Sequence, residues 1–351
     1  MKNEPTSVHA VAEACGVSAM TVSRVFRNSP NVSPETRVRV RAAAEKLGYR
    51  PDPQVARLME LLRGHRAKKV RAKLALIRDE SADRSPHETG CNYVRLDDVK
   101  KRAVQYGYEV EEFFPVRAGI TPKRLRKILE TRGIRGVLVS VGSAESFGAR
   151  FDYAGFAAAT FGFGLTNPPL HRAGTNMTQG ILAAVERLEA RGFRRIGLSV
   201  SPWIDARSGH TYSGAWLHYQ QAVPARRRVP LLLFAQAELE RNEARFHAWM
   251  KAHRPDVVIS FHRTVPEWLG AGSGTSLVVH DWTPEMREFA GINHRRDHVA
   301  AAAVDLVVTQ LQHNEHGVPA VPRQILIPPE FVDGPLEDAE VDRDLRAWSA
   351  D

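Results

Sequence analysis

One short run near the start of the chain combines side chains that can read base edges. Ala19, Met20 and Arg24 lie within VSAMTVSRVF, where apolar positions repeat at helical spacing. An arginine can donate two parallel hydrogen bonds to a guanine, and apolar side chains can contact the methyl group of a thymine. We therefore expect these three residues to contact the bases of double-stranded DNA.

Hydroxyl, amide and guanidinium groups around the same run suit the phosphate oxygens of a duplex. Contacts of this kind position a protein on DNA without reading its sequence. The residues expected to make them are Ser18, Thr21, Ser23, Arg27 and Asn31.

Two short helices joined by a tight corner would present these side chains. Apolar residues recur at helical spacing on both sides of Gly16, a residue suited to ending one helix and turning the chain. Ser18 can cap the second helix through its hydroxyl group. This arrangement is typical of a helix-turn-helix, whose second helix enters the major groove. A small helical subdomain that binds nothing would show the same apolar spacing.

The distribution of charge favours DNA binding over that alternative. Residues 1–73 hold 15 Lys and Arg against 6 Asp and Glu, and the rest of the chain holds 34 of each. The formal net charge of +9 therefore falls entirely on the N-terminal part of the chain. A concentrated basic region is the electrostatic signature of phosphate binding.

A third helix is expected directly after this motif. Ser33 can cap it, Pro34 suits its first turn and Gly48 ends it. Its buried stripe is predicted to consist of Val38, Ala42, Ala43 and Leu47. Through this stripe the helix should share a core with the first two.

The runs that carry this head are VAEACGVSAMTVSRVF and NVSPETRVRVRAAAEKLGYRPD. They resemble, without a gap from about Val8 to Asp52, the DNA-binding head of the LacI/GalR family of bacterial transcription regulators. The most specific part of the match is VS-x-x-TVSR. One departure is Ala10, where the family often has an acidic residue. The resemblance implies an all-α helix-turn-helix head over residues 1–52.

Residues 53–73 form the expected joint between head and body, and Pro53 can open a short helix there. In the LacI/GalR family a hinge helix at this place pairs with its twin in the dimer and pushes a leucine between base pairs in the minor groove. Such a wedge bends the duplex. The family register places the wedge on Leu58, with Met59 beside it. In an ordinary linker, Leu58 would only pack against its own helix.

From residue 74 the pattern changes to short apolar runs that alternate with amphipathic segments. Regular alternation of strand and helix predicts an α/β body of parallel sheets with crossover helices. The predicted strands are 74–77, 109–114, 136–141, 157–161, 195–200, 231–234, 257–261 and 276–280. The predicted helices are 93–106, 122–131, 177–191, 212–222, 241–253 and 299–313.

In the same family the body resembles a two-lobed periplasmic sugar-binding protein. The resemblance implies that residues 74–335 divide into two lobes, with the chain crossing between them near Gly164, Ile292 and Gln324. The first lobe would hold about 74–164 and 292–323, and the second about 165–291 and 324–335. Residues 336–351 are acidic and are expected to form a surface tail.

Polar side chains follow several of the predicted strands, and in open parallel sheets ligands bind beyond the carboxyl ends of the strands. The candidate effector-binding residues are Asp79, Ser81, Ser143, Trp203, Arg207, His210, His262, Asp281 and Trp282. Carboxylates and indoles suit the hydroxyl groups and ring faces of sugars. Asp281 has the strongest case, because the LacI/GalR family commonly has an effector-binding aspartate there. Taken singly, each candidate could equally be a strand-end cap or a surface residue.

Signals of an enzyme or a metalloprotein are weak in this sequence. His313 with His316, and His294 with His298, have loosely metal-like spacing but lack the partners that would complete a site. Neither a phosphate-cradling glycine loop nor a nucleophile elbow occurs. We therefore expect no catalytic residues, no metal and no cofactor. The chain also lacks a signal peptide and a membrane-length apolar run, which favours a cytoplasmic protein without membrane contacts.

Together these features predict a homodimeric transcription regulator, a repressor by expectation, that binds a near-palindromic operator. A small-molecule effector, with sugars as the first candidates, would bind between the lobes and change operator affinity. One alternative is a DNA-binding architectural protein whose body only dimerises. A weaker alternative is an enzyme fused to a DNA-binding head.

Overall fold

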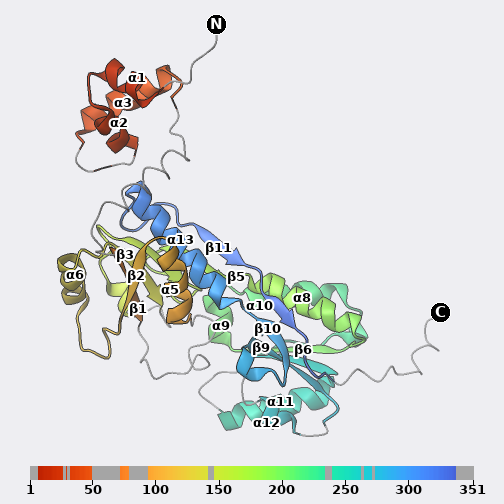
Figure 1. The fold of residues 1–351 in the computed structure, drawn as a ribbon. Coiled ribbons are helices and arrows are strands. Elements are labelled where there is room, and N and C mark those ends of the chain that lie inside the picture. Colours follow the sequence, from red (N-terminus) through yellow and green to blue (C-terminus); the bar gives the residue numbers. More distant parts are fainter. Residues whose placement is uncertain are drawn as a thin grey trace.

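The computed structural model describes residues 7–26, 29, 32–49, 72–78, 94–140, 146–233, 239–261, 265–270 and 273–336. They form a head of short helices and an α/β body built on two six-stranded sheets (Figure 1). Within these ranges, none of the helices combines the length and the apolar character needed to cross a membrane. The predicted fold class, a helix-turn-helix head on a two-lobed body, is confirmed.

The head consists of α1 (Val8–Cys15), α2 (Ala19–Phe26) and α3 (Pro34–Lys46). Gly16 ends α1 in the left-handed conformation, with φ of 61°, which a glycine adopts without strain. Ser33 caps α3 by accepting a hydrogen bond from the backbone N–H of Thr36, as predicted. These turns bring the apolar faces of the three helices together in one small core.

The buried stripe of α3 differs from the predicted one. Val40 and Ala44 are buried in the head core, whereas Val38 is 70% exposed and Leu47 is also exposed. The segment VRVRAAA offers apolar residues on more than one side of a helix, so spacing alone does not select the buried side. A tertiary contact accompanies the observed orientation, because the guanidinium group of Arg37 donates to the carbonyl oxygen of Ser29 at 2.9 Å.

The first sheet is parallel throughout its paired strands, in the order β11-β5-β4-β3-β1-β2. Its strands are β1 (Ala72–Arg78), β2 (Tyr108–Phe113), β3 (Gly136–Ser140), β4 (Ala157–Phe161), β5 (His171–Thr175) and β11 (Gln324–Ile327). One face packs on α5 (Leu96–Gln105) and α13 (Arg296–His313). The other face packs on α6 (Pro122–Thr131) and the short α7 (Phe147–Arg150). This first lobe is therefore a three-layer α/β unit.

The second sheet has the order β12-β10-β9-β8-β6-β7, with only β12 antiparallel to its neighbour among the described pairs. Its strands are β6 (Ile196–Val200), β7 (Leu232–Leu233), β8 (Val257–Ser260), β9 (Ser276–Trp282), β10 (Ala290–Asn293) and β12 (Glu330–Val332). The helices and 3₁₀ turns of this lobe are α8 (Met177–Ala190), α9 (Pro202–Arg207), α10 (Thr211–Ala222), η2 (Ala225–Arg227), α11 (Leu239–His253), α12 (Val265–Leu269) and η3 (Pro284–Met286).

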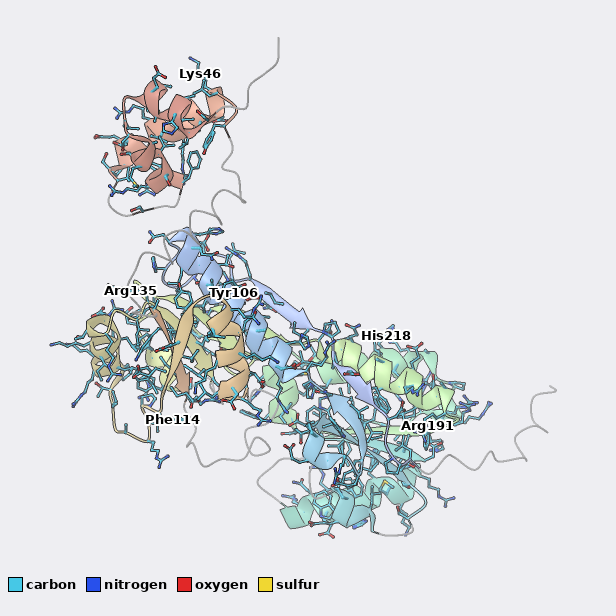
Figure 2. The ribbon with its side chains drawn as sticks, in the orientation of Figure 1. Lys46, Tyr106, Phe114, Arg135, Arg191 and His218 are labelled. Atoms are coloured by element: carbon cyan, nitrogen blue, oxygen red, sulfur yellow. The ribbon has the colours of Figure 1, made fainter. Side chains whose placement is uncertain are left out.

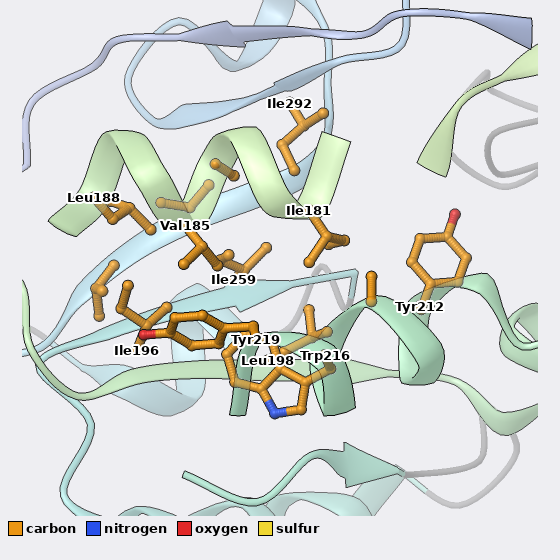
Figure 3. Packing of buried hydrophobic residues seen from close by; sticks show 14 of the residues in the cluster. Ile181, Val185, Leu188, Ile196, Leu198, Tyr212, Trp216, Tyr219, Ile259 and Ile292 are labelled. Carbon is orange, nitrogen blue, oxygen red and sulfur yellow. The ribbon is translucent and has the colours of Figure 1, made fainter. Parts of the chain in front are cut away.

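The core of this second lobe lies on both faces of its sheet. On one face, Trp216 and Tyr219 of α10 pack with Ile181 and Val185 of α8 over the strands (Figure 3). On the other face, α11 and α12 contribute aromatic side chains such as Phe246. The second lobe is thus also a three-layer unit with its own core.

The chain crosses between the two sheets later than predicted at the first and third places, and beside the predicted residue at the second. β5 still belongs to the first sheet, so the first crossing follows Thr175 and not Gly164. β10 belongs to the second sheet, so the second crossing follows Asn293, one residue after Ile292. β11 pairs in parallel with β5, so the third crossing follows Ile327 and not Gln324.

Hydrogen bonds join the three crossings to one another. The hydroxyl group of Thr175 donates to the carbonyl oxygen of His294 at 3.1 Å. The backbone N–H of Asn176 donates to the carbonyl oxygen of Ile327 at 2.9 Å. The crossings therefore form a single connected hinge between the lobes.

The expected tail at 336–351 begins later than residue 336. Leu336 is buried in the core of the second lobe, and its carbonyl oxygen accepts a hydrogen bond from Arg191 at 3.2 Å. Figure 2 labels Arg191 on this lobe. Residues 337–351 lie outside the described residues.

Candidate functional site

The exposed face of α2 carries the predicted base-reading side chains. Met20 is 58% exposed and Arg24 is also exposed, and the two lie one turn apart on the same side of the helix. Ala19 is only half-buried, because it packs against the rim of the head core. Val22 and Val25 on the opposite side are fully buried and anchor the helix.

Ser18 and Thr21 form the N-terminal cap of α2. The Ser18 hydroxyl oxygen accepts a hydrogen bond from the backbone N–H of Thr21 at 3.1 Å, and the two hydroxyl oxygens are 2.9 Å apart. The cap fixes the start of the helix, as expected from the sequence. Ser23 is half-buried on the same helix. Arg27, Asn31 and Leu58 lie outside the described residues.

In the body, α9 directly follows the carboxyl end of β6 and carries two of the predicted effector residues. Trp203 is 49% exposed, and the guanidinium carbon of Arg207 lies 4.3 Å from the centre of its ring. The two residues are four positions apart, so they share one side of the helix. This cation–π stack holds the indole in a defined orientation at the edge of the sheet.

A buried carboxylate orients His210. Asp205 is almost fully buried and accepts hydrogen bonds from the backbone N–H of Ser213 at 3.0 Å and from its hydroxyl group at 2.8 Å. The Nδ1 atom of His210 lies 3.0 Å from Asp205 Oδ2. Burial opposes ionisation of Asp205, but the hydrogen bonds from Ser213 and His210 outweigh it and hold the pKa of this carboxyl below its usual value. The other ring nitrogen of His210 is therefore left for solvent or a ligand.

Asp281, near the end of β9, already forms an ion pair within the protein. The guanidinium group of Arg296 donates a hydrogen bond to Asp281 Oδ1 in an ion pair. The side chains of Asp281 and Arg296 are only 16% and 12% exposed. Beside Asp281, the indole N–H of Trp282 donates to the carbonyl oxygen of Phe289 at 3.1 Å. Trp282 thus braces the turn after β9, and its N–H group already has a partner.

Aromatic and imidazole rings pack behind this ion pair. His280 stacks on Phe261 with ring centres 3.5 Å apart, and Tyr212 meets both rings edge-on. His294 Nε2 lies 3.2 Å from His280 Nδ1 and 3.7 Å from Asp281 Oδ1. Burial lowers the pKa of His280 well below its usual value and that of His294 to about 4. Both rings are therefore neutral at physiological pH.

The carboxyl edge of the first sheet also presents polar groups. Arg78 at the end of β1 donates to Glu112 Oε1 at 2.6 Å and to the carbonyl oxygen of Val94 at 2.7 Å. Ser140 on β3 is the cross-strand partner of Arg78 and is fully buried. Its hydroxyl group has no hydrogen-bond partner among the described residues. Asp79, Ser81, Ser143 and His262 lie outside the described residues.

The structure adds Tyr212, His280, His294 and Arg296 to the residues predicted for this region. The sequence suggests His294 only through loosely metal-like spacing, and the described residues contain no group of three or more His, Cys, Asp or Glu side chains arranged to hold a metal. The run NHRRDH at the start of α13 was the available signal for Arg296. Nothing in its spacing connects it to a carboxylate on β9.

A helix-turn-helix head and a body of two largely parallel sheets joined by a triple crossing define the class of fold, a helix-turn-helix domain on a periplasmic-binding-protein-like body. Residues 7–52 match the family model "Bacterial regulatory proteins, lacI family". The family match concerns the head alone, and the fold of the whole chain is that of solved LacI-type proteins.

Curated relatives match the head alone. The transcriptional regulator MalR of Streptococcus pneumoniae is 46% identical over 48 residues, which are 14% of this chain and 15% of that protein. The transcriptional regulator GalS of Salmonella typhimurium is 52% identical over 46 residues, 13% of this chain and 14% of that protein. The chain therefore aligns with only about a seventh of each relative's length.

Solved structures match nearly the whole chain in fold. The lac repressor dimer bound to operator and the anti-inducer ONPF has a TM-score of 0.50 at 19% identity, covering 96% of this chain and 99% of that one. The regulator CelR in complex with cellobiose has a TM-score of 0.53 at 18% identity, covering 95% and 99%. At this level of identity the likeness concerns the fold.

Proposed function

We propose that the chain is a sequence-specific transcription regulator that acts as a homodimeric repressor on a near-palindromic operator. The observation that carries the proposal is the exposed pair Met20 and Arg24 on α2, in the part of the chain that holds its net positive charge. The N-terminus of α2 is capped, one face of α2 is exposed and the opposite face packs on the head core. These are the properties of a recognition helix. The names of the relatives with the same head support this function.

In this proposal different residues of the N-terminal part contact the bases, the phosphates and the minor groove of the DNA. Arg24 reads a guanine, while Met20 and Ala19 contact thymine methyl groups. The phosphate contacts fall to Ser18, Thr21, Ser23, Arg27 and Asn31. Leu58 is the minor-groove wedge. A chain with these roles works where the chromosome is, in the cytoplasm.

Selection of bound DNA from a random pool tests the proposal. The full-length protein should enrich one half-site repeated in inverted orientation, because two copies of the head present two recognition helices. Arg24→Ala should lose the preference at one position in each half-site. Lys46→Ala, which removes a positive charge at the end of α3, is the matched control and should enrich the wild-type sequence. A pool without an enriched sequence would contradict the proposal.

We further propose that a small molecule, with sugars as the first class to test, binds at the carboxyl ends of the strands and changes operator affinity. Trp203 offers a ring face held by Arg207, and His210 offers a nitrogen atom oriented by Asp205. Asp281 supplies the carboxylate, and Trp282 the aromatic surface beside it. Asp79, Ser81, Ser143 and His262 are the further expected contacts. A cellobiose complex of a protein with this fold supports the class.

One observation favours the alternative of an effector-independent regulator. Arg296 already occupies the carboxylate of Asp281, and Phe289 already accepts from the indole N–H of Trp282. Titration of the selected DNA with and without cell metabolite extract distinguishes the two functions. A response to the extract supports the effector-dependent regulator, and unchanged affinity supports a body that only dimerises.

A further inference from the structure

The ion pair between Asp281 and Arg296 joins the two lobes. Asp281 is the second-last residue of β9, a central strand of the second sheet. Arg296 is the first residue of α13, and α13 packs on β3, β4 and β5 of the first sheet. The two side chains therefore belong to different lobes, although only fourteen residues separate them along the chain.

The surroundings of this pair make it more than a surface contact. Both side chains are mostly buried, so water screens their attraction less than at an exposed site. The Nε atom of Arg296 is buried and has no hydrogen-bond partner among the described residues, and Asp281 forms an ion pair with the guanidinium group. Separating the lobes at this point would leave two charges without their partner.

The pair also lies next to the backbone of the second crossing between the lobes. His294 lies between β10 and α13, at the second crossing, and its carbonyl oxygen accepts from Thr175 at the first crossing. Arg296 follows two residues later.

We propose that the Asp281–Arg296 ion pair is a latch that holds the two lobes in one relative orientation. The proposal adds a regulatory contact to the effector site proposed above and rests on that function for its biological use. A ligand that takes over the Asp281 carboxylate releases Arg296 and thereby frees the lobes to rotate. The latch itself is a property of the unliganded chain, and it can be tested without DNA or effector.

The test measures a distance between the lobes in the full-length protein. Spin labels are attached at cysteines that replace Lys127 on α6 and Lys251 on α11, two exposed positions in different lobes. Cys15→Ser and Cys91→Ser remove the native thiols, and dilution with unlabelled protein suppresses signals between the two copies of a dimer. Pulsed electron paramagnetic resonance then gives the distribution of the distance between the labels.

The latch predicts a specific pattern across variants. Arg296→Gln should shift the mean distance beyond the width of the original distribution, or broaden it, and Asp281→Asn should have the same effect. The double variant should show no further change, because both substitutions break one interaction. Arg102→Gln is the matched control: its ion pair with Asp305 at 2.7 Å lies within the first lobe, and the distribution should stay unchanged.

Three results would overturn the latch. Distributions for Arg296→Gln and Asp281→Asn that equal that of the parent protein would show that the ion pair is only local. A change of the same size in Arg102→Gln would show a general loss of packing. Additive changes in the double variant would show that the two residues act separately. Because none of these measurements involves DNA, a failed latch leaves the proposed DNA-binding function standing, and failed DNA selection leaves the latch testable.

Discussion

His294 Nε2 lies 3.2 Å from His280 Nδ1, and both imidazole rings are buried where the chain leaves the second lobe. A hydrogen bond between two imidazoles needs one donor and one acceptor, so the contact requires at least one neutral ring. Burial places the pKa of His294 at about 4 and that of His280 well below the usual value, with the nearby Arg296 lowering both further. The folded protein thus keeps both rings uncharged at neutral pH.

This pair predicts that the protein loses stability in mild acid. In the unfolded chain a histidine takes up its proton near pH 6.5, whereas folded His294 does so only near pH 4. The free energy of unfolding should therefore be constant above about pH 7 and fall as the pH drops, by on the order of 2 kcal/mol for His294 alone between pH 6.5 and 5. Denaturant titration at several pH values measures this slope.

Two substitutions separate this effect from general titration. His294→Gln removes one of the two buried imidazoles and should reduce the slope between pH 7 and 5. His218→Gln removes an exposed imidazole from α10, labelled in Figure 2, and should keep the slope of the parent protein. Equal slopes for His294→Gln and the parent protein would disprove the role of the buried pair.

The recognition helix gives a second prediction. Arg24→Ala should weaken binding to the selected operator by about 1–3 kcal/mol and relax the base preference at one position, because a bidentate contact to guanine is lost. Met20→Gln should change the preferred base, since an amide can pair with adenine where the thioether met a methyl group. Binding of selected and random DNA, measured by fluorescence anisotropy at fixed salt, gives both effects. Unchanged preference in both variants would remove α2 from base recognition.

The corrected face of α3 gives a third prediction. Val40→Ala should destabilise the head by about 1–2 kcal/mol, because it removes two buried methyl groups from a small core. Val38→Ala, the matched control two residues earlier, should change stability by less than about 0.5 kcal/mol, because Val38 is exposed. Hydrogen exchange of the backbone amides of α1 and α2 in the full-length protein reports on this core. The reverse order of effects would restore the stripe predicted from spacing.

Elements with strong local signals were predictable from the sequence. The predicted helix at 122–131 coincides with α6, whose signals are local: Thr121 caps it and Pro122 stands in its first turn. β5 was missed for the opposite reason: HRAGT has no apolar run, yet every residue in it is buried. Its polar side chains are satisfied by distant partners, as when Arg172 donates to the carbonyl oxygens of Gly162 and Leu165. Misplacing β5 also misplaced the first crossing.

In the candidate site too, residues that follow predicted strands could be found from the sequence, whereas a residue brought in from a distant element could not. The rule that ligands bind beyond strand ends selects Trp203, His210 and Asp281, which follow or end strands of the second sheet, and their role as ligand contacts stays a prediction. It gave no means of finding Arg296. The ion pair exists because α13 returns to the first lobe and places its first residue against β9, and only the three-dimensional arrangement of the lobes brings this about.

The last prediction concerns Asp281 as the point where effector and DNA binding meet. Asp281→Asn keeps the shape of the side chain but removes its charge, so an effector that uses the carboxylate should lose its influence on operator affinity. Binding of operator without effector should remain, because α2 is untouched. The coupling is reciprocal. If the effector no longer changes the affinity for operator, the operator no longer changes the affinity for effector. Asparagine is the better choice than alanine, which would also empty the space beside the buried Arg296.

The measurement is an operator titration of Asp281→Asn and the parent protein, each with and without the active fraction of the metabolite extract. Asp305→Asn is the control, because it breaks the ion pair with Arg102 inside the first lobe and should respond to the fraction as the parent protein does. If Asp281→Asn responds at the same concentration as the parent protein, Asp281 does not contact the effector. If only the parent protein and the control respond, the carboxylate that Arg296 holds in the unliganded chain is the one that the effector takes over.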